Sequence, residues 1–168
     1  DILGAWREIG ARGSEDFQAW QQRFEAAPTD SRRAFEAALA KDLTSGAREA
    51  LETLKQNWLS DQSKLATRKA SGDVLDTLTP HVPWLVGGSA DLSGSNNTKA
   101  KSMDVLDADN YAGTYLHYGV REHGMAAAMN GMSLHGGMVP YAGTFLVFTD
   151  YCRPAIRLSA LMRQQVIY

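Results

Sequence analysis

Residues 118–125 read YGVREHGM and residues 139–144 read VPYAGT, and these two stretches decide the fold. The first follows an apolar segment and leads into residues 126–129, AAAM, which are good helix formers. A strand is therefore expected to end at this point and a helix to begin, with Glu122 in the first helical turn.

Phe145, Phe148 and Tyr151 recur every three residues in a helix that we expect over residues 145–162. Side chains at i, i+3 and i+6 fall within about a third of the helix circumference. Such a face can hold a flat heteroaromatic ring by stacking and apolar contact. A carboxylic acid kept neutral by an apolar site can donate a hydrogen bond to a ring nitrogen. Glu122 and the three aromatics therefore form one candidate site.

Each part of this candidate site also has an ordinary structural interpretation. An acidic residue in the first turn of a helix complements the helix dipole without any further role. Aromatic residues at helical spacing are often core residues, because a helix buries one apolar face. The spacing alone leaves both interpretations open.

Outward from these stretches, the pattern alternates strands and helices. We expect strands over residues 84–88, 115–118, 138–141 and 166–168, and helices over residues 65–78, 121–134 and 145–162. This alternation predicts an α/β fold, a parallel β-sheet with flanking helices and right-handed crossovers. Ligands of such sheets bind beyond the carboxyl ends of the strands. Glu122 and Asp91 both follow strands, so both are expected at that edge.

A polar segment over residues 89–110 is a second candidate region, because long loops inside compact domains are often functional. It contains Asp91 and Ser95, which ordinary turn chemistry also explains. Upstream, Arg68 lies near the start of its helix, and an arginine is well shaped to bind a phosphate with two hydrogen bonds. The alternative for Arg68 is an exposed basic residue without a role.

The first part of the chain carries most of the charge: residues 1–79 hold 24 of the 36 Asp, Glu, Lys and Arg residues. Amphipathic helices are expected there, and no chemistry. The formal net charge of −2 gives no reason to expect nucleic acid or a membrane as a partner. One cysteine permits no intrachain disulfide, and the first twenty residues carry six charges, which is not typical of a signal peptide. These features favour a cytoplasmic protein.

No metal site is expected on this chain. His117, His123 and His135 do not form a ligand pattern of the HExxH kind, and Cys152 stands alone. Cys152 is better explained as a small core residue.

Four short segments resemble the signatures of transketolase, a thiamine diphosphate enzyme, in its pyrimidine-binding domain. They are ATRK at residues 66–69, GGSADL at 87–92, YGVREHGM at 118–125 and PYAGTFL at 140–146. The resemblance covers about residues 64–168, and residues 1–63 resemble the helical end of the family's first domain and its linker. The expected organisation is therefore a helical linker segment followed by the N-terminal part of a truncated pyrimidine-binding domain with the thiamine diphosphate-binding fold.

The resemblance implies a role for each candidate residue. Glu122 matches the acid that hydrogen-bonds a pyrimidine ring nitrogen, and Phe145, Phe148 and Tyr151 match the apolar clamp for the ring. Asp91 matches an aspartate on the thiazolium side of the cofactor. Arg68 and Ser95 match residues that hold the phosphate of the sugar substrate. Gly94 stands where many relatives have proline, which puts the shape of this loop in question.

The resemblance also implies an activity: transfer of a two-carbon ketol unit from a ketose phosphate to an aldose phosphate in the pentose phosphate pathway. The cofactors implied are thiamine diphosphate and Mg²⁺ or Ca²⁺, whose ligands, a Gly-Asp-Gly…Asn motif, lie outside this chain. The partners implied are sugar phosphates and a second copy in a homodimer, with the active site at the subunit interface. On this view the chain alone is inactive. Two alternatives stay open, a ketol transferase like dihydroxyacetone synthase and a non-catalytic interaction module that retains the fold.

Overall fold

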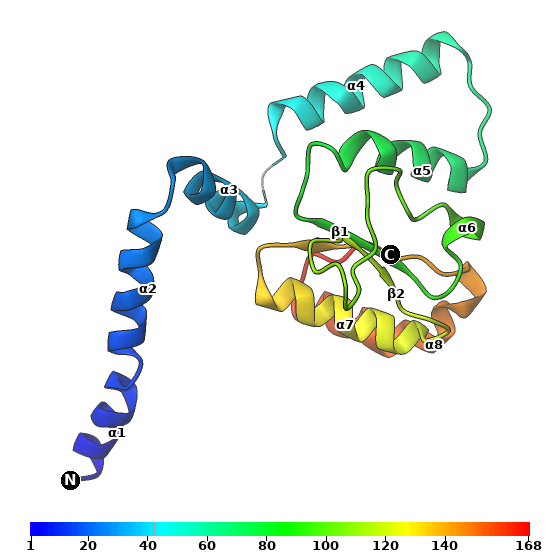
Figure 1. Ribbon diagram of the computed structural model, residues 1–168. Coiled ribbons are helices and arrows are strands. Elements are labelled where there is room, and N and C mark those ends of the chain that lie inside the picture. Colours follow the sequence, from blue (N-terminus) through cyan, green and yellow to red (C-terminus); the bar gives the residue numbers. More distant parts are fainter. Residues whose placement is uncertain (42) are drawn as a thin grey trace. The chain divides into compact units, whose positions relative to one another are not determined.

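The computed structural model describes residues 1–41 and 43–168 (Figure 1), and the chain divides into two compact units, Asp1–Ala37 and Ala38–Tyr168. The first unit holds the helices α1 (Ile2–Ala11) and α2 (Ser14–Ala26) and the larger part of α3 (Thr29–Ala40). The expected helical character of this region is confirmed. The domain boundary expected between residues 63 and 64 concerns the whole protein and stays a prediction.

The second unit alternates helices and strands. Its elements are α4 (Ser45–Ser60), α5 (Thr67–Leu78), β1 (Leu85–Ser89), α6 (Ser93–Asn96), β2 (Tyr115–His117), α7 (Glu122–His135), β3 (Val139–Pro140), the short 3-10 helix η1 (Leu146–Phe148) and α8 (Thr149–Leu161). The polar segment expected as one long loop contains the short helix α6.

The three strands form a parallel sheet in the order β2-β1-β3, as the alternating pattern predicts. Gly87 of β1 lies opposite Tyr115 of β2, and Leu85 of β1 lies opposite Val139 of β3. The strand expected over residues 166–168 is reduced to a single parallel bridge between Tyr141 and Ile167. The central strand is therefore β1, and its carboxyl end lies between those of its two neighbours.

Helices cover both faces of this sheet. In Figure 1, α7 and α8 lie together on one face, whereas α5 lies on the other with α4 outside it. Met125 and Met129 of α7 are 1% and 0% exposed and pack with Ala90 and Ala142, which follow β1 and β3. The predicted α/β fold with flanking helices is thus confirmed. Among the described residues, no helix has both the length and the apolar character needed to cross a bilayer.

Two adjacent glycines in β1 are required because aromatic rings cross the strand. A β-carbon on Gly87 would come within 2.4 Å of the Tyr141 ring, and one on Gly88 within 2.3 Å of the Tyr118 ring. The Tyr141 hydroxyl donates to the Thr98 carbonyl oxygen at 2.7 Å. Burial raises the pKa of Tyr118 to about 12, so this phenol stays neutral over the physiological range. The two rings pack the segments that follow β2 and β3 against the central strand.

Candidate active site

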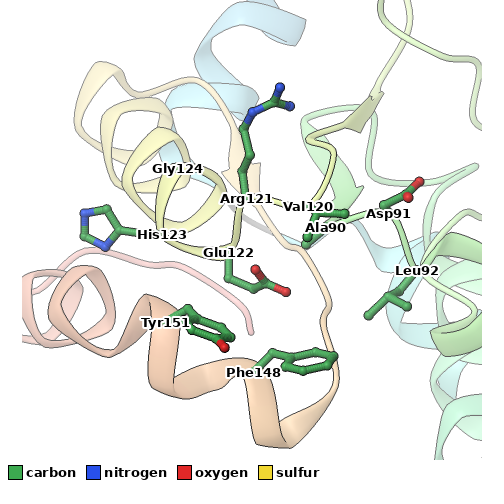
Figure 2. A pocket seen from close by; sticks show the side chains of 10 residues that line it. All are labelled: Ala90, Asp91, Leu92, Val120, Arg121, Glu122, His123, Gly124, Phe148 and Tyr151. Carbon is green, nitrogen blue, oxygen red and sulfur yellow. The ribbon is translucent and has the colours of Figure 1, made fainter.

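A cavity of about 790 Å³ lies where the carboxyl ends of the strands converge (Figure 2). Residues 90–92, which follow β1, form one wall, and residues 120–124, which follow β2, form another. Phe148 and Tyr151, which follow β3, complete the lining. This is the edge at which open parallel sheets bind their ligands. The structure therefore brings Glu122, Asp91 and two of the three predicted aromatics to one cavity.

A tight turn between β2 and α7 presents Glu122 to the cavity. Gly119 adopts a positive φ of 69°, a backbone conformation that residues with a side chain rarely adopt. That guanidinium donates to the Tyr118 carbonyl oxygen at 2.9 Å and so closes the turn. Glu122 is the first residue of α7, as expected, and is only 8% exposed.

The Glu122 carboxyl group has one oxygen engaged and one available. The Thr144 hydroxyl donates to Glu122 Oε1 at 3.1 Å, and it is the only hydrogen-bond partner of this carboxyl group within residues 1–41 and 43–168. Figure 2 shows the group directed into the space bounded by Phe148 and Leu92. A residue that only complemented a helix dipole would gain nothing from this burial, because the dipole interaction is also available to an exposed acid.

The aromatic series is present, but its backbone differs from the expected single helix over residues 145–162. Phe145 is extended, with φ −70° and ψ 146°, η1 follows, and α8 begins only at Thr149. A 3-10 helix has three residues per turn, so side chains at i and i+3 lie directly above one another. Phe145 and Phe148 accordingly stack at 6.1 Å, and Phe148 and Tyr151 at 6.2 Å. Phe148 and Tyr151 line the cavity, whereas Phe145 stacks on Phe148 without lining it.

Asp91 reaches the cavity through its backbone more than through its carboxylate. Its φ of 62° lies in the left-handed region, which a non-glycine residue rarely adopts without a local reason. Figure 2 shows the Asp91 carboxylate turned away from Glu122. The loop is held by Ser89, which is 0% exposed, accepts from the Leu92 amide at 3.0 Å and donates to the Gly143 carbonyl oxygen at 3.1 Å.

The structure places Arg68 and Ser95 together, although 27 residues separate them in the chain. The Arg68 guanidinium donates to the Ser95 carbonyl oxygen at 3.3 Å, and both side chains are exposed. Arg68 lies in the first turn of α5, whose N-terminus has no side-chain cap, so backbone N–H groups there are available to an anion. Arg68 also lines a second cavity of about 830 Å³ in the same unit, separate from the one around Glu122.

Sequence analysis missed two residues that shape the first cavity, Ser89 and Thr144. Both lie inside the short motifs that carry the resemblance, but neither has a spacing that marks it. Their hydrogen bonds connect residues that are 54 and 22 positions apart, Ser89 with Gly143 and Thr144 with Glu122. Only the three-dimensional fold reveals such contacts.

Cys152 lies in the core behind the site, as expected. It is 1% exposed and packs with Ala126 and Ala155. Burial raises the pKa of the Cys152 thiol, a backbone hydrogen bond opposes this to a smaller extent and the Glu122 charge adds to it, so the thiolate is disfavoured. Within the part of the chain that the structure describes, no group of three or more His, Cys, Asp or Glu residues is arranged to hold a metal ion.

Comparison with known proteins decides the family. The family model for the transketolase pyrimidine-binding domain matches residues 63–168. The chain belongs to the transketolase family. It is 51% identical over 168 residues to a transketolase of Cereibacter sphaeroides and 45% identical over 168 residues to one of Rhodobacter capsulatus. Both matches cover 100% of this chain but 25% of the relative, so the chain spans about a quarter of the length of these transketolases.

Solved transketolase structures match the fold as well. The transketolase of Leishmania mexicana superposes with a TM-score of 0.78 at 36% identity, covering 92% of this chain and 23% of that one. A transketolase of Pichia stipitis in complex with sedoheptulose 7-phosphate superposes with a TM-score of 0.82 at 33% identity, covering 95% of this chain and 24% of that one. Membership of the transketolase family therefore rests on both sequence and structure.

Proposed function

We propose that the protein containing this chain is a transketolase that transfers a two-carbon ketol unit from a ketose phosphate to an aldose phosphate. This chain supplies the half-site for the aminopyrimidine ring of thiamine diphosphate and a contact for the substrate phosphate. The observation that carries the proposal is a buried acid, Glu122, in the same cavity as the stacked rings of Phe148 and Tyr151.

The residues present suit an aminopyrimidine ring. A cavity of about 790 Å³ falls in the size range of small-molecule sites. A flat heteroaromatic ring needs an apolar surface on which to stack, and Phe148 and Tyr151 offer one. A ring nitrogen needs one polar partner, and the second oxygen of Glu122 is available for it.

When bound, thiamine diphosphate supplies a thiazolium carbon that becomes a nucleophile once its proton is lost to the cofactor's own amino group. Glu122 holds a proton at the pyrimidine ring nitrogen opposite that amino group, which makes the amino group a better base. Phe148 and Tyr151 offer the surface on which the ring would stack, Phe145 stacks on Phe148, and the burial of Glu122 keeps water from competing for this hydrogen bond. Asp91 lines the same cavity, and we assign it to the side on which the thiazolium ring would lie.

Arg68 and Ser95 form the phosphate contact in this proposal. The guanidinium is exposed and held by the Ser95 carbonyl oxygen, so it is positioned and still accessible. A transketolase of Pichia stipitis has been solved with sedoheptulose 7-phosphate, which is consistent with a phosphorylated sugar as the ligand of a relative.

The wider role follows from the family. We propose a homodimer in which a second subunit completes each active site, and Mg²⁺ or Ca²⁺ bound through a Gly-Asp-Gly…Asn motif elsewhere in the protein. The reaction belongs to the pentose phosphate pathway, and the protein acts in the cytoplasm.

Substitution of Glu122 in the whole protein tests the proposal. Glu122→Gln keeps the size of the side chain and can donate a hydrogen bond but cannot transfer a proton, and Glu122→Ala removes both abilities. A positioned acid is typically worth about a hundred- to ten-thousandfold in rate, so we expect both variants to slow ketol transfer by that order. Steady-state turnover of xylulose 5-phosphate with ribose 5-phosphate measures it.

Glu15→Ala is the matched control, because Glu15 also lies in the first turn of a helix, α2, but is exposed. It loses only a dipole interaction and should leave turnover unchanged. Equal turnover of Glu122→Ala and Glu15→Ala would contradict the proposed role and favour a non-catalytic module.

A further inference from the structure

We propose that Thr144 is a positioning residue that sets the direction of the Glu122 carboxyl group and thereby its hydrogen bond to the pyrimidine ring nitrogen. This inference rests on the proposed function and adds a second residue to it. The contact on which the inference is based is the hydrogen bond from Thr144 Oγ1 to Glu122 Oε1 at 3.1 Å.

The backbone just before Thr144 is held by the sheet, which places the Thr144 side chain close to Glu122. The preceding residue, Gly143, donates to the Gly88 carbonyl oxygen at 3.2 Å, and Gly143 also forms a parallel bridge with Ser89. The Ser89 hydroxyl donates to the Gly143 carbonyl oxygen at 3.1 Å. Hydrogen bonds on both sides of Gly143 therefore anchor this segment to β1, and Thr144 follows directly.

Thr144 has its effect because a carboxyl group has two oxygens that are chemically equivalent until one is engaged. The Thr144 hydroxyl donates to Oε1, and Oε1 can accept this hydrogen bond whether the acid is ionised or carries its proton on Oε2. Oε2 is then the oxygen left for the ring nitrogen, and rotation of the carboxyl group is restricted. Without Thr144, the Glu122 side chain can rotate about several bonds, and either carboxyl oxygen can face the ring nitrogen.

Thr144 lies between two cavities, so the effect of its hydroxyl can be separated from the effect of its packing. Thr144 also lines the second cavity, the one that Arg68 borders, while its hydroxyl reaches Glu122 at the first. It therefore lies in the partition between the two cavities. A side chain of the same shape without the hydroxyl would fill this partition equally well, so valine separates the hydrogen bond from the packing.

The test compares four variants of the whole protein: Thr144→Val and Thr144→Ala, which remove the hydroxyl, Thr144→Ser, which keeps it, and Thr77→Val. Thr77 is the matched control, a partly buried threonine whose hydroxyl donates to the Asp73 carbonyl oxygen at 2.7 Å in α5. Thermal unfolding of the apoproteins first confirms that each variant is folded. The alanine variant keeps the test available if the valine variant is unfolded.

The first measurement is a binding ratio that needs no turnover. Apoprotein affinity is measured for thiamine diphosphate and for an analogue in which CH replaces the ring nitrogen opposite the amino group. We expect the ratio of the two affinities to fall about three- to tenfold in Thr144→Val, the amount that one misdirected hydrogen bond is worth. Thr144→Ser restores the ratio, and Thr77→Val leaves it at the wild-type value.

The second measurement is the exchange of the thiazolium proton for deuterium on the bound cofactor. We expect Thr144→Val to slow it about five- to tenfold and Thr144→Ser to restore it. An unchanged ratio and exchange rate in Thr144→Val, with both reduced in Glu122→Ala, would overturn the role of Thr144 and leave the proposed function intact. If Glu122→Ala itself leaves the ratio and the exchange unchanged, the proposed function fails and the inference with it.

Discussion

We propose that Glu122 carries the chemistry of this chain, and its surroundings are built from a tight turn and a hydrogen bond from Thr144. A glycine with positive φ, an arginine that closes the turn and a threonine that engages one oxygen together direct a buried acid into a cavity. Each contact is small, but together they remove the freedom that an exposed glutamate would have. A buried acid with one free oxygen is well suited to hold a single proton at a single ring atom.

Arg68 allows a second test that is independent of the cofactor. We expect Arg68→Ala to raise the apparent KM for phosphorylated sugars by about one to two decades and that for unphosphorylated sugars far less. The reason is that a lost hydrogen bond to a charged group costs roughly 1.5–3 kcal/mol. Steady-state kinetics with xylulose 5-phosphate and with an unphosphorylated ketose measure the difference.

Lys69→Ala is the control for Arg68, because it removes the neighbouring positive charge. The Lys69 side chain pairs with Asp73 rather than with Ser95. An equal loss with both kinds of sugar in Arg68→Ala, or the same loss in Lys69→Ala, would show that Arg68 does not recognise the phosphate.

At single positions, the sequence identified the residues that belong to local patterns or to the resembling motifs. Glu122 and the aromatic series were predictable because an acid at a helix start and aromatics at regular spacing are local patterns. The pairing of Arg68 with Ser95 came only from the resemblance. Thr144 and Ser89 were not predictable, because a hydroxyl has no periodic signature and its partner lies far away in the chain.

The helices and strands hold the short connecting segments that carry these residues. The central strand β1 carries two glycines because the Tyr118 and Tyr141 rings cross it, and this close contact brings the ends of all three strands together. Polar contacts hold α7 and α8 together. Asn130 of α7 donates to the Ala155 carbonyl oxygen of α8 at 2.9 Å, and Ser159 of α8 is hydrogen-bonded to Asn130. Glu122 and Tyr151 lie on these two helices, so their separation is set by this packing.

The stacked aromatics of η1 and α8 give a test of the ring clamp. We expect Phe148→Ala to lower the affinity for thiamine diphosphate by about tenfold, because a stacked aromatic contact contributes about 0.5–1.5 kcal/mol beyond the area it buries. Equilibrium titration of the apoprotein measures the affinity, and thermal unfolding without cofactor measures stability.

Phe17→Ala is a matched control, since Phe17 stacks on Trp20 at 6.0 Å in α2, far from the cavity in the chain. It should leave the affinity unchanged. If Phe148→Ala lowers the thermal midpoint sharply and leaves the affinity as it was, Phe148 is a core residue and not part of a ring clamp.

Most elements of the α/β unit were predictable in order and type, but their ends, the 3-10 turn and the short helix α6 were not, and the strand expected over residues 166–168 is a single bridge. Hydrophobic runs and helix formers reveal a strand or a helix over several residues, and β1, β2, β3, α5 and α7 follow the expected pattern. The start of α8 differs because Phe145 is extended and one 3-10 turn precedes the helix. A spacing of three residues fits an α-helix and a 3-10 helix almost equally well, so the sequence pattern does not separate them.

Two apolar side chains just before Phe148 in the chain are exposed. Leu146 and Val147 are 85% and 69% exposed. Exposed apolar surface of this kind marks sites of contact with other protein surfaces. We therefore propose that other parts of the protein, including a second subunit, cover this region and complete the site.

That proposal predicts the behaviour of the isolated chain. We expect these 168 residues alone to show no ketol transfer and no tight binding of thiamine diphosphate, because the chain spans about a quarter of its relatives and the diphosphate and metal ligands are proposed to lie elsewhere. Isothermal titration and a coupled assay of the purified chain measure this, with the whole protein as the control. Turnover by the purified chain would contradict the proposal of a shared site.

The most direct test of the central claim, that Glu122 activates the bound cofactor, is the rate of deuterium exchange at the thiazolium carbon. Quenched-flow NMR on the whole protein measures it without any sugar present. We predict that Glu122→Ala, with cofactor bound, slows the exchange by about a hundred- to ten-thousandfold. If Glu122 only complements the dipole of α7, the change is about 0.3–1 kcal/mol of stability and the exchange is unaffected. A Glu122→Ala protein that binds the cofactor and exchanges at the wild-type rate would contradict the claim.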